Sequence, residues 1–323
     1  MRLLHRLQGL GQSLLGHDAR LQQRLLSPAE LLSLRRQAQG AALNLQSLRD
    51  SRHPQLGDLR SPQRGSGMDF DESRPYVPGD DRRFINWRLL ARTGEMYLKL
   101  FHEERRSQLF LLLDRSASMR MGSQGSLKVT QAARLACLLT CLAEKENMAT
   151  GAAVINETTH WHRPMIGAQA QQRLFEDFIA AAPPLEGSGK ADLQQILIHI
   201  EGQLPAGSVV ILLSDFHSLA AQHEAALWAL VSKHRVIALQ IDDPLEHKLP
   251  KQKGLRFSAS ETGAVVALDG QDEAMSQSYR TLMQQHRDSI HQRLSSLGIE
   301  TYRFSTTDDL SDTDLLRSHL HGK

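Results

Sequence analysis

Two apolar runs in the sequence each end close to a carboxylate, and hydroxyl side chains follow the first of them. Five apolar residues, 109–113, precede Asp114, which is followed by Ser116 and Ser118 at alternate positions. A second apolar run leads through a serine to Asp215. Oxygen ligands with few carboxylates suit a hard divalent cation such as Mg²⁺, which keeps several of its waters. These four residues are therefore the candidate metal ligands.

The four side chains converge only if the two apolar runs are neighbouring strands. Short continuous apolar runs are typical of strands buried on both faces of a parallel sheet. Ligands bind outside the carboxyl ends of such strands, where the strand order reverses. An alternative explains the same residues equally well: the serines cap the next turn, and Asp114 and Asp215 accept backbone N–H groups.

Residues 108–323 alternate between apolar runs and amphipathic stretches. The predicted strands are 109–113, 152–155, 208–215, 235–241 and 298–304. Residues 159–165 are expected to complete a hairpin with 152–155, and residues 255–268 to form a second hairpin. The predicted helices are 126–147, 169–182, 192–203, 220–232, 271–297 and a closing helix at 308–320. Alternating strands and helices predict an α/β domain with an open, doubly wound, mostly parallel sheet.

Residues 1–107 are predicted to form a smaller helical and Arg-rich β element. Ser27 and Glu30 are spaced as a capping box, with a proline at the first helical position between them. A strand is expected at 97–101 and a loop at 49–67. Residues 1–110 hold 18 Lys and Arg against 12 Asp and Glu, whereas the rest of the chain holds 20 against 24. The basic charge of the chain is thus concentrated in its N-terminal third.

Four arginines surround apolar anchors in this element and form the candidate partner-binding surface. They are Arg82, Arg83, Arg88 and Arg92. Spacing alone favours their pairing with carboxylates of the same element, namely Asp80, Asp81, Glu103 and Glu104. The alternative, functional hypothesis is that the four arginines form a charged docking surface for an acidic partner.

The amino-acid composition disfavours one class of function and indicates the state of the cysteines. Aromatic residues make up 5% of the chain, which disfavours nucleic-acid binding by base stacking. Cys137 and Cys141 lie in an apolar helical pattern and are expected to be buried free thiols, consistent with a reducing compartment.

No run reaches the about 18–20 apolar residues needed to span a bilayer. The first 26 residues predict an amphipathic helix that packs on protein or contacts a membrane surface. We therefore predict a cytoplasmic protein.

A longer motif lies in the Arg-rich element. It reads YVPGDD at 76–81, RFINWR at 83–88 and ARTG at 91–94. This motif resembles the signature of a bacterial family catalogued as domain of unknown function 58, in which it precedes a von Willebrand factor A-like domain. The resemblance covers roughly residues 28–305. Asn86 departs from it, because the family usually carries an acidic residue there.

The resemblance implies a Rossmann-like fold and a metal-ion-dependent adhesion site. Asp114, Ser116 and Ser118 match the Asp-x-Ser-x-Ser segment with which this site begins. Asp215 matches the aspartate that the site takes from later in the sequence. Ala191 stands where a threonine ligand is expected, which weakens the site for Mg²⁺. The neighbouring Lys190 would be able to place an ammonium there in place of the cation.

The resemblance also implies a function without catalysis. Such proteins are thought to act with MoxR-type AAA+ ATPases in the chaperone-like maturation or assembly of a client protein. This chain has no P-loop of its own, because the glycine and hydroxyl positions of that motif fall on Pro184 and Ala191. We predict a non-enzymatic protein-interaction module that is a partner or adaptor of such an ATPase.

Two other functions compete with this prediction. In the first, Asp114 and Asp215 hold Mg²⁺ for phosphoester hydrolysis. In the second, the N-terminal arginines bind nucleic acid. Other histidine patterns carry less weight: His160 and His162 are expected to be exposed hairpin residues, and His217 a chance neighbour of Asp215.

Overall fold

The computed structural model describes residues 19–41, 45, 68–77, 82–103, 108–183, 191–258 and 265–310. The chain forms two compact units, a small one within residues 52–106 and a larger one from the remainder. Several predictions fall largely outside the described residues: positions 1–18 of the N-terminal amphipathic helix, the loop at 49–67 and most of the closing helix at 308–320. In the described part of that N-terminal helix, residues 19–26 contain only the short 3₁₀ turn Ala19–Gln22. Asp80, Asp81 and Lys190 also lie outside the described residues.

The larger unit is built on a six-stranded sheet with the order β10-β7-β6-β3-β4-β5. Its strands are β3 (Leu109–Asp114), β4 (Thr150–Ile155), β5 (Thr159–Met165), β6 (Val209–Ser214), β7 (Arg235–Asp242) and β10 (Glu300–Ser305). Numbered in chain order within the sheet, this is the doubly wound order 3-2-1-4-5-6, and of its strands β5 runs antiparallel. The predicted fold class is confirmed, and the order reverses between β3 and β6.

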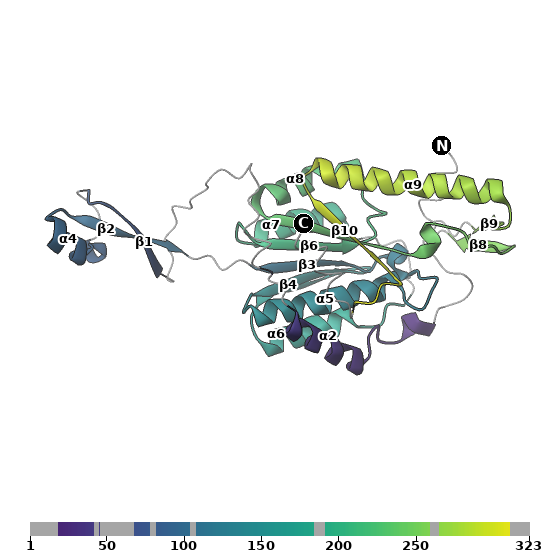
Figure 1. Cartoon of the computed structure of the whole chain (residues 1–323), viewed down its shortest axis with the longest axis horizontal. Coiled ribbons are helices and arrows are strands. Elements are labelled where there is room, and N and C mark those ends of the chain that lie inside the picture. Colours follow the sequence, from purple (N-terminus) through teal and green to yellow (C-terminus); the bar gives the residue numbers. More distant parts are fainter. Residues whose placement is uncertain are drawn as a thin grey trace. The chain divides into compact units, whose positions relative to one another are not determined.

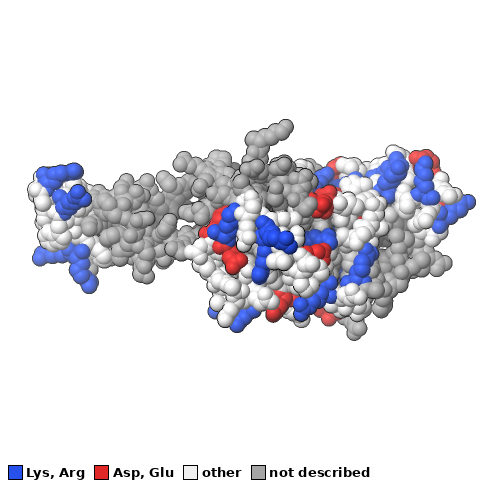
Figure 2. Space-filling model, turned by 60° about the horizontal axis from the view of Figure 1, so that its bottom comes forward, with Lys and Arg blue, Asp and Glu red and all other residues white. Residues whose placement is uncertain are grey.

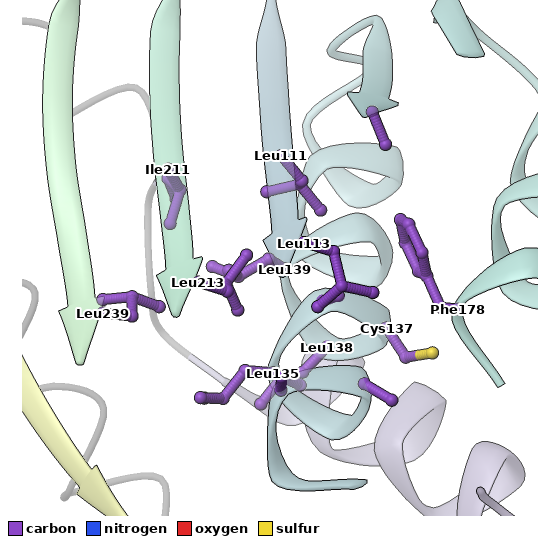
Figure 3. Packing of buried hydrophobic residues seen from close by; sticks show 14 of the residues in the cluster. Leu111, Leu113, Leu135, Cys137, Leu138, Leu139, Phe178, Ile211, Leu213 and Leu239 are labelled. Atoms are coloured by element: carbon purple, nitrogen blue, oxygen red, sulfur yellow. The ribbon is translucent and has the colours of Figure 1, made fainter. Parts of the chain in front are cut away.

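Helices cover both faces of this sheet (Figure 1). They are α2 (Pro28–Gly40), α5 (Lys128–Lys145), α6 (Ala168–Phe178), α7 (Leu193–Gln203), α8 (Glu224–Lys233) and α9 (Glu273–Ser296). Helices α2, α5 and α6 share one apolar cluster, whereas α7, α8 and the C-terminal half of α9 share the other. Alternate residues of β3 enter the two clusters: Leu111 and Leu113 face α5 (Figure 3), and Phe110 and Leu112 point to the opposite face. Burial on both faces explains why this run is continuously apolar.

Helix α2 packs on α5 and belongs with the larger unit. Its predicted capping box is confirmed, since the Glu30 N–H donates to Ser27 Oγ and the Ser27 N–H to Glu30 Oε2. Glu30 Oε1 also lies 3.0 Å from a guanidinium nitrogen of Arg134 on α5. Residues 28–40 therefore sit on the sheet unit, a finding that differs from the grouping of residues 1–107. The domain boundary at 107/108 stays a prediction.

Edge strand β5 meets its neighbour β4 closely. The register between them shifts after Thr150, where Gly151 faces Pro164. A Cβ atom on Gly151 would lie 2.8 Å from the His162 carbonyl oxygen and 2.8 Å from the Pro164 ring. Glycine at this position therefore permits the irregular pairing.

Short elements complete the larger unit. The 3₁₀ turns are η1 (Ala19–Gln22), η3 (Ala117–Arg120), η4 (Ala221–His223) and η5 (Pro244–Glu246). Strands β8 (Leu255–Ser258) and β9 (Val265–Leu268) pair antiparallel, which confirms the pairing predicted for 255–268. Turns η3 and η5 follow the carboxyl ends of β3 and β7, so they lie at the edge of the sheet where ligands bind in such folds.

The small unit pairs β1 (Met68–Pro75) with β2 (Tyr97–Glu103) in antiparallel fashion. Between these strands lie η2 (Arg82–Phe84) and α4 (Trp87–Thr93). Asn86 is the N-cap of α4, since its side chain accepts the Leu89 N–H at 3.2 Å. Gly94, with φ of 78°, ends the helix in the left-handed conformation. Asparagine at position 86 therefore has a structural role, which needs no negative charge.

Candidate functional site

The carboxyl end of β3 brings three of the predicted ligands together. Asp114 is buried as the last residue of β3, and its Oδ1 accepts the Ser116 N–H at 2.8 Å. The hydroxyl oxygens of Ser116 and Ser118 are 3.3 Å apart, and both side chains are half-buried. Ser116 begins η3 without a side-chain capping bond. The capping alternative is therefore not the role of Ser116, although Asp114 does accept a backbone N–H group.

The Asp114 carboxylate is held by hydrogen bonds from a hydroxyl and from a backbone N–H group. Its Oδ2 accepts the hydroxyl of Ser214 at 2.6 Å, and among the described residues no basic side chain forms an ion pair with it. Burial raises the pKa of Asp114, and the nearby charge of Asp215 raises it further, against the lowering effect of the hydrogen bonds from Ser214 and Ser116. A buried carboxylate without a counter-charge attracts either a proton or a cation.

Asp215 lies close enough to influence Asp114, but it is paired with a lysine. Its Oδ2 lies 2.8 Å from Nζ of Lys128, which is itself 2.5 Å from Oε1 of Glu246. Lys128 is the first residue of α5, and all three side chains are buried. Burial disfavours the Lys128 ammonium, but the two carboxylates outweigh it and raise the pKa of Lys128 above its usual value. Lys128 thus places a positive charge next to Asp215, where the sequence predicted a metal ion, and no sequence pattern predicted this lysine.

The same lysine stabilises the charged form of both acids. Burial would raise the pKa of Asp215, but the Lys128 ammonium and His217 reverse this effect and lower it. The pKa of Glu246 is also held below its usual value against burial, chiefly by Lys128 and by the hydrogen bond from His217. Both carboxylates are therefore ionised at neutral pH.

His217 extends this network to α9, so its prediction as a chance neighbour is wrong. Its Nε2 lies 3.1 Å from Glu246 Oε1, and its Nδ1 lies 2.7 Å from Nε2 of His286, with the two rings stacked. Burial and the charge of His217 lower the pKa of His286 to about 4. One carboxylate oxygen or ring nitrogen from each of Asp215, His217 and Glu246 lies within 4.8 Å of the others. A metal ion there would have to compete with the Lys128 ammonium.

Asp243, at the end of β7, ties three loops of this edge together. Its carboxylate accepts the Ser123 N–H at 2.9 Å and the Thr306 hydroxyl at 2.7 Å. It also accepts the Leu245 N–H at 2.9 Å, while Glu246 accepts the Asp243 N–H in return. The loops after β3, β7 and β10 are thereby held together.

Two arginines beside the serines have structural contacts. Arg115 is buried, and its guanidinium donates to the carbonyl oxygens of Asp177, Ala180 and Ala181 at 2.7–2.9 Å. Arg120 donates from Nε to the Arg115 carbonyl at 3.0 Å. Both residues fix the loop that carries Ser116 and Ser118.

The remaining predicted residues of the larger unit are Ala191 and the two histidines of β5. Ala191 is half-buried against the apolar cluster around α7, and its side chain offers no oxygen. The histidines of β5 were predicted to be exposed, which is right for His160 and wrong for His162, because His162 is half-buried. Both are bonded to Asp177, at 3.1 and 2.8 Å. This contact fixes β5 to the end of α6.

The four predicted arginines lie on η2 and α4 of the small unit, and all four are exposed. Their predicted acidic partners Asp80, Asp81 and Glu104 lie outside the described residues, and the side chain of Glu103 is not described either. The docking and internal-pairing hypotheses therefore both stay predictions.

Comparison with known proteins shows the family to which the chain belongs. The model of the family described as "Protein of unknown function DUF58" matches residues 72–289. The chain belongs to this family. The uncharacterized protein Rv1480 of Mycobacterium tuberculosis (strain ATCC 25618 / H37Rv) is 24% identical over 245 residues, which cover 76% of this chain and 77% of that protein. The uncharacterized protein Mb1516 of Mycobacterium bovis has the same identity and coverage.

Parts of this chain also align with solved structures. The conserved hypothetical protein BatB from Bacteroides thetaiotaomicron aligns with a TM-score of 0.36 and 15% identity, covering 59% of this chain and 98% of BatB. Proximal thread matrix protein 1 from the mussel byssus, in a form with a zinc-occupied MIDAS motif, aligns with a TM-score of 0.32 and 14% identity. That alignment covers 42% of this chain and 38% of the mussel protein. Among the described helices of this chain, none has the length and apolar character of a membrane span.

Proposed function

We propose that this chain is a non-enzymatic protein-interaction module that binds its partner at the carboxyl edge of the sheet. The observation that carries the proposal is the pair of half-buried hydroxyls, Ser116 and Ser118, beside the buried carboxylate of Asp114, which forms no ion pair with any basic side chain that the structure describes. This arrangement offers polar groups that bind a partner without an evident catalytic base. The partner that the family signature favours is a MoxR-type AAA+ ATPase, which acts with the chain in maturation or assembly of a client protein.

Asp114, Ser116 and Ser118 fit a hard cation, whereas Asp215 does not fit as a direct ligand. One carboxylate and two hydroxyls, completed by water, are an oxygen set that Mg²⁺ accepts. The Oδ2 atom of Asp215 is instead bound by Lys128, and Ala191 adds no ligand. When bound, the ion would supply a positive charge that attracts a carboxylate of the partner. With a single carboxylate ligand, we expect the metal affinity to be weak and the partner to strengthen it.

A second contact surface is formed by Arg82, Arg83, Arg88 and Arg92 of the small unit. Nucleotide hydrolysis then belongs to the ATPase, and this chain contributes recognition of the ATPase and of the client. We place this activity in the cytoplasm, where such an ATPase would meet it.

The test is binding of the full-length chain to the MoxR-type ATPase encoded nearest to it, measured by calorimetry with ATP analogue, ADP or no nucleotide. We expect binding in at least one state, and at least a tenfold loss of affinity in a Ser116→Ala/Ser118→Ala variant. The matched control is Ser295→Ala/Ser296→Ala, which removes two exposed hydroxyls at the end of α9. Absence of binding in every nucleotide state would overturn the proposal.

A phosphoester-hydrolysis assay on the wild type and on an Asp114→Ala variant distinguishes this function from that of a hydrolase. Turnover of phosphoesters that needs Mg²⁺ and is lost in Asp114→Ala would support a phosphohydrolase and contradict the interaction module. We expect no difference between wild type and variant in such a screen.

A further inference from the structure

The outer face of α4 combines an exposed tryptophan with two arginines. Residues 87 and 91 are one helical turn apart, as are 88 and 92, so Trp87, Ala91, Arg88 and Arg92 form two adjacent rows. All four are exposed, whereas Leu89 and Leu90 on the other side of the helix are half-buried. Trp87 keeps 64% of its surface exposed. We refer to these four residues as the α4 face.

The described surroundings of the α4 face are cationic. In the described stretch 82–97, Arg82 and Arg83 add two more exposed arginines, and the acidic side chain present is Glu95. Glu95 accepts the hydroxyl of Tyr97 at 3.0 Å. Figure 2 shows basic side chains on the described surface of the small unit and no acidic side chain on the side in view. The face therefore complements a negatively charged ligand.

The residue types on this face are those that dominate binding at protein interfaces. Tryptophan and arginine are enriched among the residues whose truncation costs most affinity. Ala91, one turn along the helix from Trp87, has a small side chain, and Trp87 itself is largely exposed, so an apolar side chain of a ligand is able to pack against it. The guanidinium groups of Arg88 and Arg92 bind carboxylates in a bidentate manner.

We propose that the α4 face binds an acidic segment of a protein partner, with carboxylates on Arg88 and Arg92 and an apolar side chain against Trp87. This inference rests on the proposed function, since it names the chemistry recognised by its second contact surface. A protein segment is favoured over nucleic acid because a single aromatic side chain offers little stacking. It is favoured over a membrane because Leu89 and Leu90 turn away from this face, which leaves no apolar stripe.

The experiment measures fluorescence anisotropy of a labelled peptide of repeated Glu-Glu-Leu units with the full-length chain. We expect binding that weakens with salt, and no binding of a Gln-Gln-Leu peptide of equal length. Arg88→Glu/Arg92→Glu and Trp87→Ala should each weaken binding by about tenfold or more. The matched controls are Trp228→Ala, a tryptophan with 65% of its surface exposed on α8, and Arg163→Glu/Arg173→Glu, two exposed arginines of the larger unit.

Three results of the peptide experiment would overturn the inference. They are no binding of the acidic peptide, equal effects of the α4-face variants and their controls, or tighter binding of a single-stranded oligonucleotide or of anionic vesicles than of the peptide. Binding of the ATPase that survives all α4-face substitutions would also contradict the inference, yet it would leave the proposed function standing. The effect of Ser116→Ala/Ser118→Ala on ATPase binding tests the proposed function alone, because these serines do not belong to the α4 face.

Discussion

The ammonium of Lys128 lies 2.8 Å from Oδ2 of Asp215, and neither side chain is accessible to solvent beyond 2%. This ion pair divides the predicted metal site into two parts. On the β6 side, the charge of Asp215 is compensated within the protein. On the β3 side, Asp114 lies next to two hydroxyls and forms no ion pair with a described basic side chain, so we expect a cation or partner to bind there.

Replacing Lys128 with methionine should destabilise the fold strongly. The substitution preserves much of the volume but leaves Asp215 and Glu246 buried without their cation, which costs about 3–5 kcal/mol in the free energy of unfolding. Urea unfolding at neutral pH measures the loss. The triple variant Lys128→Met/Asp215→Asn/Glu246→Gln should recover most of it, and a single-variant loss below about 1 kcal/mol would contradict the role of the pair.

Divalent cations should stabilise the chain through Asp114. Because a ligand that binds only the folded state raises its stability, Mg²⁺ or Mn²⁺ should raise the melting temperature of the wild type in a concentration-dependent way. The response should disappear in Asp114→Ala and weaken in Ser116→Ala/Ser118→Ala. Equal responses of wild type and Asp114→Ala, in melting curves with matched ionic strength, would exclude a cation at these residues.

In the absence of metal, Asp114→Asn should stabilise the protein. The asparagine can accept the Ser116 N–H and donate to Ser214, while the buried negative charge near Asp215 is removed. We expect a gain of about 0.5–2 kcal/mol in EDTA at neutral pH, the range common for such substitutions. A loss of stability in EDTA would show that the Asp114 charge is compensated in the fold.

The contacts of Asp177 with His160 and His162 should make part of the stability acid-sensitive. Burial would raise the pKa of Asp177, but the hydrogen bonds from His162 and His160 outweigh it and lower the pKa. A carboxyl whose pKa is lowered by folding stabilises the protein above its unfolded pKa, near 3.9, and loses this effect as pH falls through the folded value. The stability difference between wild type and Asp177→Asn, about 1 kcal/mol near pH 5, should therefore vanish as the pH falls below about 4. Denaturant midpoints measured from pH 5 downward test this, and a pH-independent difference would contradict it.

Local sequence features predicted the scaffold and half of the site. The run 109–113 specifies a strand buried on both faces, and the position of Asp114 at its end follows from that assignment. The Ser27–Glu30 capping box could also be recognised in the sequence, because its two partners are three residues apart. Features that depend on short-range periodicity are recoverable from a single sequence.

The charge network was missed because its partners are distant along the chain. Lys128 has the appearance of an ordinary polar residue near the start of a helix, and Glu246 lies 118 residues away. The spacing of Asp243 and Glu246 around a proline is a capping-box signal that would have placed Glu246 at the turn after β7. No local pattern could have shown that α5 delivers an ammonium to that turn.

The irregular pairing of β5 has a consequence for the behaviour of the chain in solution. Among the described strands, β5 ends the sheet, and an open strand edge is a template for aggregation. Pro164 has no N–H group to donate, Arg163 is charged, and the shift in register opposite Gly151 interrupts the regular ladder. We therefore expect β5 to be a poor template for strand addition by a second chain.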